Sequence, residues 1–254
     1  MKHIVTYKNE SFNMKPMAAY ITEYIIKKKL DKPINSEDHY EYFPKTREEL
    51  VKNIKELIKD NRYNFNCIDT SEITDMSYLF KDLGDKIENN DFDVSEWNVS
   101  NVETMEYMFC LCQNFTGKGL ENWDVSKVEN MTATFIYCRK FDGKSIENWD
   151  VSNVISTRSM FYSCHSLDCD LSKWDVSNVK NMGHMFFECK NFEGNGIDNW
   201  DVSNVNNMDF MFYSCSSFKN NNLKKWNTNE LKHTFNMFHN CTSLKNKPRL
   251  IRKK

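Results

Sequence analysis

All six tryptophans of the chain recur at a nearly constant interval. They are Trp97, Trp123, Trp149, Trp174, Trp200 and Trp226, and the successive separations are 26, 26, 25, 26 and 26 residues. A fixed internal period of 20 to 50 residues is typical of repeat architectures, in which each unit buries its apolar edge against its neighbours. The sequence therefore predicts stacked copies of one unit.

Further residues recur at fixed distances from each tryptophan. Phenylalanine stands twelve positions later, at Phe109, Phe135, Phe161, Phe186, Phe212 and Phe238. Cysteine follows three positions after it, at Cys112, Cys138, Cys164, Cys189, Cys215 and Cys241. A seventh, degenerate copy precedes these, with Ile68 in the tryptophan place. We expect the tryptophan, phenylalanine and cysteine columns to form ladders inside the stack.

Two local patterns within each copy predict its secondary structure. Leu120-x-x-Trp123-x-Val125 and its counterparts suggest a short strand with one buried face. The apolar spacing of Val179, Met182 and Met185 is typical of one or two helical or 3₁₀ turns. The predicted fold class is an α/β repeat solenoid over residues 63–244, a leucine-rich-repeat-like right-handed coil of seven rungs, each with a short parallel strand and a short helix or 3₁₀ turn.

The segments that flank the repeats differ from them in composition. Thr46-x-x-Glu49 is a capping box, and an apolar stripe follows it, so residues 43–62 are predicted to form a helix that caps the first rung. Residues 1–42 are expected to be partly helical and have no assigned role. Residues 245–254 hold six basic and no acidic groups and are expected to form a basic tail.

Composition and motifs argue against several function classes. Residues 63–244 hold 15 basic and 26 acidic groups, whereas nucleic-acid binding requires a basic face. The sequence has no glycine-rich phosphate loop, no nucleophile elbow and no histidine pair at metal spacing, so we expect no enzyme, no cofactor and no metal. No apolar stretch of about 20 residues predicts membrane insertion, and the start lacks the apolar core of a signal peptide, which predicts a cytoplasmic protein.

The cysteine column allows three interpretations. Free thiols can pack in the core, neighbouring rungs can form disulfides, or the sulfurs can bind a metal. The lack of a signal peptide favours free thiols.

A row of acidic residues directly follows four consecutive tryptophans, at Asp124, Asp150, Asp175 and Asp201. Each carboxylate can accept backbone hydrogen bonds in the following Val-Ser corner. Alternatively, because like charges in a row repel, a basic partner or a cation can lie along it. The predicted partner-binding site consists of this acidic row with Glu121, Glu147 and Asp198.

One string of residues resembles a known family. Trp-Asp-Val-Ser-Asn-Val-x-Asn-Met-x-x-Met-Phe-x-x-Cys-x-x-Phe, from Trp174 to Phe192, is similar to the repeat of the BspA-like leucine-rich-repeat surface proteins, also described as the mycoplasma-type lipoprotein repeat. The resemblance covers residues 65–244. It implies a bacterial-type interaction module used in adhesion or protein contacts, with the cell surface or secretion as the alternative location.

The predicted function is a protein–protein interaction module that binds a partner protein along the strand face. The alternative is a structural or adhesion and assembly element, with or without a bound cation.

Overall fold

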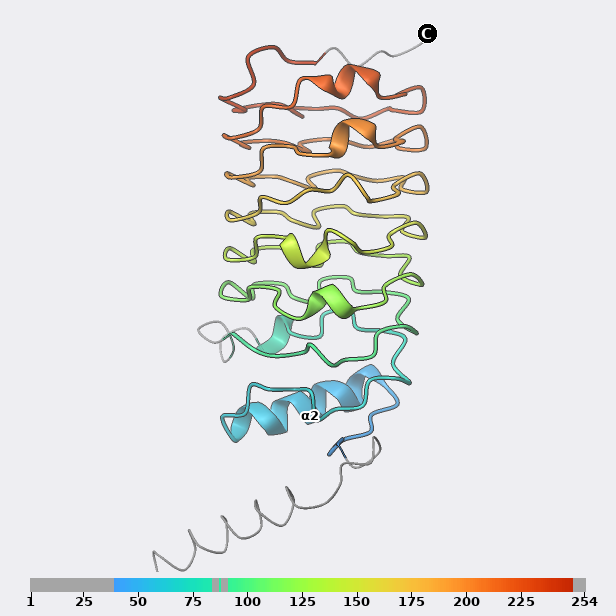
Figure 1. Cartoon of the computed structure of the whole chain (residues 1–254), viewed down its shortest axis with the longest axis vertical. Helices are drawn as coiled ribbons and strands as arrows, with labels where there is room; N and C mark the ends of the chain where they lie inside the picture. The colour runs from blue at the N-terminus through green and yellow to red at the C-terminus, as the bar shows by residue number, and fades with distance from the viewer. Residues whose placement is uncertain (1–38, 84–86, 88–90, 249–254) are drawn as a thin grey trace, which may run out of the picture. The chain divides into compact units, whose positions relative to one another are not determined.

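The computed structural model describes residues 39–83, 87 and 91–248. The chain divides into two units, residues 1–39 and 40–254, and the following description concerns the second. Of the segment 1–42, which was predicted to be partly helical, residues 1–38 lie outside the described residues, as do residues 249–254 of the predicted basic tail 245–254. In the second unit, successive repeats lie one above another, and the helix α2 lies at the end where the chain enters the stack (Figure 1).

The helix α2 spans Arg47–Lys59, within the segment predicted to form a cap. Its N-cap is Thr46, whose hydroxyl accepts a hydrogen bond from the Glu49 N–H at 3.3 Å. The Glu49 carboxylate accepts from the Lys45 N–H at 2.8 Å, one residue before the N–H that a capping box would use. One face of α2 is buried through Leu50, Ile54, Leu57 and Ile58.

The prediction of an α/β repeat solenoid with a parallel strand in each of seven rungs is wrong. No extended strand occurs among the described residues. Neighbouring repeats meet instead at single-residue parallel bridges, which form one column through Asp75, Thr104, Asn130, Ser156, Asn181, Asn207 and His233. Besides α2, the part of the chain that the structure describes contains five short 3₁₀ helices, η1 (Lys81–Leu83), η2 (Leu120–Asn122), η3 (Lys144–Ile146), η4 (Ile197–Asn199) and η5 (Asn222–Lys225).

The segment that was predicted to be a strand is mainly a turn. In the third repeat, η2 begins at Leu120, and the Trp123 N–H donates to the Leu120 carbonyl at 3.2 Å. The spacing of three residues between Leu120 and Trp123 is that of one 3₁₀ turn. Trp123, with φ −74° and ψ 127°, has an extended backbone where this turn ends. The inward alternation of Trp123 and Val125 therefore does not require a strand.

The segment that was predicted to be helical is a series of β-turns. The N–H groups of Met185, Phe187 and Cys189 each donate to the carbonyl three residues earlier, at 3.2, 3.1 and 3.0 Å. His184 and Glu188 have φ values of 60° and 56°, which is the conformation of the third residue of a type II turn. Apolar side chains therefore return to the interior every three or four residues without α-helical hydrogen bonds.

The tryptophan and phenylalanine columns lie inside the stack. The tryptophan side chains are 3–5% exposed, and each indole N–H donates to a carbonyl of the preceding repeat at 2.8–3.1 Å. The Trp97, Trp123 and Trp149 rings follow one another at 6.3 Å with planes within 6°. Rings of the phenylalanine column, starting at Phe80, are 5.3–5.9 Å apart. Each repeat therefore contributes one aromatic layer that its neighbours cover.

Thr157 breaks this regular core and provides a stability test. It is fully buried where most repeats have methionine, and its hydroxyl has no hydrogen-bond partner among the described residues. Because an unpaired buried hydroxyl is unfavourable, Thr157→Val should raise the free energy of unfolding by about 1–2 kcal/mol, measured by urea denaturation.

The matched control for Thr157→Val is Thr134→Val. The Thr134 hydroxyl is equally buried but bonds the carbonyls of Met105 and Met131, at 3.1 and 2.9 Å. Its removal should lower stability by about 1 kcal/mol. A loss of stability in both variants would contradict the role given to the unpaired hydroxyl.

Candidate functional site

The acidic row is exposed, and each of its carboxylates takes part in a local turn. Oδ1 of Asp124, Asp150, Asp175 and Asp201 accepts the N–H of the serine two residues later, at 3.0–3.1 Å. These hydrogen bonds to serine lower the pKa of Asp124 and Asp175. One oxygen of each carboxylate therefore already has a hydrogen bond within its own turn, without a partner protein or a cation.

The three carboxylates that were grouped with this row also have contacts within the protein. Glu121 accepts the Gly119 N–H at 2.9 Å, and Glu147 accepts the Asp170 N–H at 3.0 Å. Asp198 lies 3.9 Å from the Lys225 ammonium. Each of these contacts ties a loop or joins two repeats, and a partner-binding role for the seven carboxylates stays a prediction.

The cysteine column is buried and hydrogen-bonded. From Cys138 onward, each thiol donates to the carbonyl of the preceding repeat's column phenylalanine, at 2.7–3.0 Å. Burial raises the pKa of Cys138, Cys189 and Cys215 well above the usual value. A protonated thiol that already has an acceptor is a structural group.

An aromatic ridge, which the sequence reasoning missed, lies on the surface of the last four repeats. Its first column stacks Tyr162, Phe187, Tyr213 and His239, with ring centroids 4.3, 4.7 and 4.9 Å apart. A second column beside it contains His184, Phe210 and Phe235, with centroids 4.9 and 5.2 Å apart. The centroid of His184 lies 5.9 Å from that of Phe187, which joins the two columns.

The ridge is only partly covered by the rest of the protein. Its side chains are half-buried or exposed, and Phe235 is 64% exposed. Because stacked rings cover one another's faces, their edges remain available, and ring edges carry partial positive charge. The first column could have been found as the thirteenth position after tryptophan, where two earlier repeats have Cys110 and Ile136.

Two titratable groups of the ridge are uncharged at neutral pH. Burial, together with Arg158, lowers the pKa of His184, although the nearby Asp209 acts in the opposite direction. Burial, with Tyr137 and Glu188, raises the pKa of Tyr162 to about 12. The ridge therefore presents mainly neutral aromatic surface.

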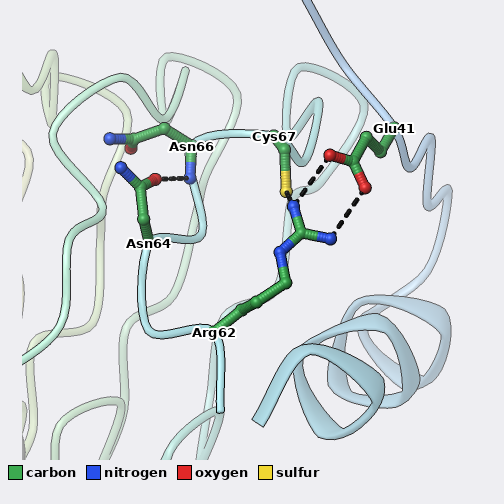
Figure 2. A network of polar contacts seen from close by, with 5 residues as sticks. All are labelled: Glu41, Arg62, Asn64, Asn66 and Cys67. Carbon is green, nitrogen blue, oxygen red and sulfur yellow. Dashed lines mark hydrogen bonds and ion pairs between the residues drawn. The ribbon is translucent and has the colours of Figure 1, made fainter. Parts of the chain in front are cut away.

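A polar network ties the segment before α2 to the first repeat (Figure 2). The Arg62 guanidinium donates to both carboxylate oxygens of Glu41, at 2.8 and 2.7 Å, and to the Cys67 sulfur at 3.5 Å. The hydrogen bond to Glu41 raises the pKa of Arg62, and burial raises the pKa of Cys67. A bidentate ion pair beside a protonated thiol is a structural tie.

Residues 39–83, 87 and 91–248 show neither a metal-binding cluster nor a membrane-spanning helix. In this part of the chain no cluster of three or more histidine, cysteine, aspartate or glutamate side chains has the arrangement of a metal site. Nor does this part contain a helix with the length and apolar character needed to span a membrane.

Comparison with known proteins gives one match. The family model described as "Mycoplasma protein of unknown function, DUF285" matches residues 48–168 and, in a second overlapping match, residues 130–250. No curated protein and no solved structure matches the chain. The two matches together cover the capping helix and the repeats.

Proposed function

Since the chain belongs to the DUF285 family of Mycoplasma proteins, whose function is unknown, we propose that it is a protein-binding module whose contact surface is the aromatic ridge. The observation that carries this proposal is the continuous stack of partly exposed rings over four repeats. Exposed apolar patches of this kind mark interaction sites on soluble domains, and aromatic residues are enriched at protein interfaces.

The distribution of the rings supports a binding role over a purely structural one. Stacking between repeats stabilises the fold, but that benefit is available at every repeat. The first column nevertheless begins only at Tyr162, and in the second column Ala133 and Ser159 separate the stacked pair Tyr78 and Tyr107 from His184. Two adjacent columns of rings occur together only in the later repeats, which suits a partner of limited size.

The similarity of the Trp174–Phe192 string to the BspA-like surface proteins supports the same proposal, because that resemblance implies adhesion or protein contacts. The acidic row remains a weaker candidate for the contact surface. Its Oδ1 atoms already accept serine N–H groups, so its presence is explained by turn formation.

Site-specific photocrosslinking in the native cell tests which surface binds. A benzophenone amino acid at Phe235 should crosslink one protein partner, whereas the same group at Asp150 in the acidic row should not. Both positions are exposed, so neither substitution should disturb the core. The crosslinked protein is then purified and titrated against the unmodified chain.

Binding by the purified partner should depend on the ridge. The double variant Phe210→Ser, Phe235→Ser should weaken it at least tenfold, since a buried aromatic contact commonly contributes more than 1.4 kcal/mol. The matched control is the double variant Asp150→Asn, Asp175→Asn, which should bind within about twofold of the original chain. Equal binding by the ridge variant, with unchanged circular dichroism, would refute the proposal.

A further inference from the structure

In the residues directly after each bridge residue, the backbone hydrogen bonds between repeats all run from an N–H group to a carbonyl of the next repeat. The N–H groups of Met182, His184, Phe186 and Glu188 donate to carbonyls of the next repeat, at Asn207, Asp209, Met211 and Tyr213, over 2.7–2.9 Å. The same pattern joins each interior pair of repeats. Each repeat therefore offers carbonyl acceptors to the repeat before it and N–H donors to the repeat after it. Along this segment the first repeat is therefore left with acceptors and the last repeat with donors, whereas just before the bridge residues the direction is reversed, as from the Lys232 N–H to the Asn206 carbonyl at 2.9 Å.

The acceptor end is covered by α2. The Arg47 side chain donates to the Ser77 carbonyl, which lies in the first repeat. Leu50, Ile54 and Leu57 of α2 are fully buried. The end that presents carbonyls is therefore covered by the chain's own helix.

The donor end has unpaired groups. Asn236, Phe238 and Asn240 occupy the positions of His184, Phe186 and Glu188, but their N–H groups have no acceptor within the described part of the chain. The intervening Met237 and His239 N–H groups close turns, at 3.5 and 3.1 Å. The last repeat therefore has free N–H donors at alternate residues. Inside the stack, equivalent donors are bonded to carbonyls at alternate residues of the next repeat.

A hollow lies against these donors. Its volume is about 390 Å³, within the range of ligand-binding pockets, and it is lined by Asn236, Phe238 and His239 together with Lys247 and Pro248. Both apolar surface and an ammonium group thus border the unpaired N–H groups.

Charge at this end favours an acidic occupant. Residues 219–248 contain six lysines and one glutamate, whereas residues 91–218 contain 19 acidic and nine basic groups. The last repeat is therefore basic on an otherwise acidic stack. A segment that carries carboxylates would be attracted to this end and repelled by the rest of the stack.

We propose that the C-terminal end of the stack binds an acidic peptide segment of another protein through the unpaired N–H groups of Asn236, Phe238 and Asn240. Carbonyls at alternate residues of the peptide accept these donors, and its carboxylates lie near Lys245 and Lys247. Backbone pairing at an open edge is a known mode of peptide recognition. A second copy of this chain fits poorly, because the first repeat's carbonyls along this segment are covered by α2 and because two C-terminal ends would bring two basic surfaces together.

The probe for the test is a synthetic, end-blocked peptide with the sequence of residues 198–214. It contains three aspartates and no lysine or arginine, and it includes the carbonyls that accept the N–H groups of the preceding repeat inside the stack. In the full-length chain, amide NMR should show Asn236, Phe238 and Asn240 becoming protected from solvent exchange when the peptide is added. Met237 and His239, which are already bonded, should change little. This alternation is the signature of the proposed pairing.

Charge variants provide the second readout. Lys245→Glu with Lys247→Glu should weaken peptide binding about tenfold, whereas Lys140→Glu, an exposed lysine of an interior repeat, should leave it unchanged. Three results would overturn the proposal: no amide shift at about 1 mM peptide, tighter binding of a single-stranded oligonucleotide than of the peptide, or self-association through this end in sedimentation. The hollow shares His239 with the aromatic ridge, but the test of the ridge depends on Phe210 and Phe235, which do not line the hollow, so the two proposals fail separately.

Discussion

Replacing Phe161 by alanine should lower the free energy of unfolding by about 3–5 kcal/mol. Its ring is fully buried in the middle of the stack, between Phe135 at 5.9 Å and Phe186 at 5.6 Å. Trp174 lies against it at 6.1 Å. Backbone hydrogen bonds hold the repeats on both sides in place, so these repeats cannot move together to fill the cavity. The loss of stability therefore includes the lost van der Waals contacts around the cavity as well as the lost free energy of burying the ring.

The matched control for Phe161→Ala is Phe238→Ala in the last repeat. Phe238 stacks on Phe212 at 5.6 Å but is 9% exposed, because no described repeat covers its other face. Its removal opens a space that water can enter, so the loss should be clearly smaller, about 1.5–3 kcal/mol. Urea denaturation of both variants measures the difference. Equal losses would show that enclosure between repeats does not determine the cost.

The interior of the stack follows from the spacing of the aromatic residues. A 26-residue interval places successive tryptophans in equivalent environments, and each indole N–H needs a buried acceptor. Trp149 finds it at Leu120, three residues before the preceding tryptophan, and Trp174 finds the equivalent Ile146. The columns predicted the ring stack, but they carry no information about backbone conformation, because any path that returns every 26 residues satisfies them.

The secondary structure could not be predicted for a local reason. Positive φ normally requires glycine or asparagine, and such residues are the usual sign of a turn. Here Tyr107, Ala133, Phe210 and Leu111 adopt it instead. The turns are maintained by hydrogen bonds to the next repeat, which is a tertiary interaction. The spacing of inward residues in such turns resembles that of a helix, which explains the error.

Of the two candidate binding surfaces, the acidic row could be predicted from the sequence and the aromatic ridge as a whole could not. The acidic row was visible as the position after tryptophan, and its turn role followed from the chemistry of aspartate. The aromatic ridge depends on positions that lie side by side only after the turns are formed. Phe235, for example, aligns in sequence with Gly183 and Asp209, yet its ring lies against that of Phe210. No column of the sequence contains both rings.

Gly196→Ala should lower the free energy of unfolding by about 2–5 kcal/mol, through two independent costs. Gly196 has φ +80°, which is unfavourable for alanine. An added Cβ would lie 2.3 Å from Asp170 Oδ1 and 2.4 Å from the Ser172 nitrogen, both in the preceding repeat. The Ser172 N–H donates a hydrogen bond to Asp170 Oδ1 at 2.9 Å, so neither atom can move away without breaking the turn that this bond closes.

The matched control for Gly196→Ala is Gly183→Ala. Gly183 does not have a positive φ, and a Cβ there would lie 3.2 Å from the side-chain oxygens of Asn181 and Asn207. A shift of a few tenths of an ångström relieves this contact without breaking the hydrogen bonds that these oxygens accept from the Gly183 and Asp209 N–H groups. The effect of this substitution should stay within about 1 kcal/mol, because reduced freedom of the unfolded chain offsets the tighter contact. Hydrogen exchange should also show faster opening at Ser172 in Gly196→Ala alone. If both variants lost equal stability, the close approach of neighbouring repeats at Gly196 could not be what requires glycine there.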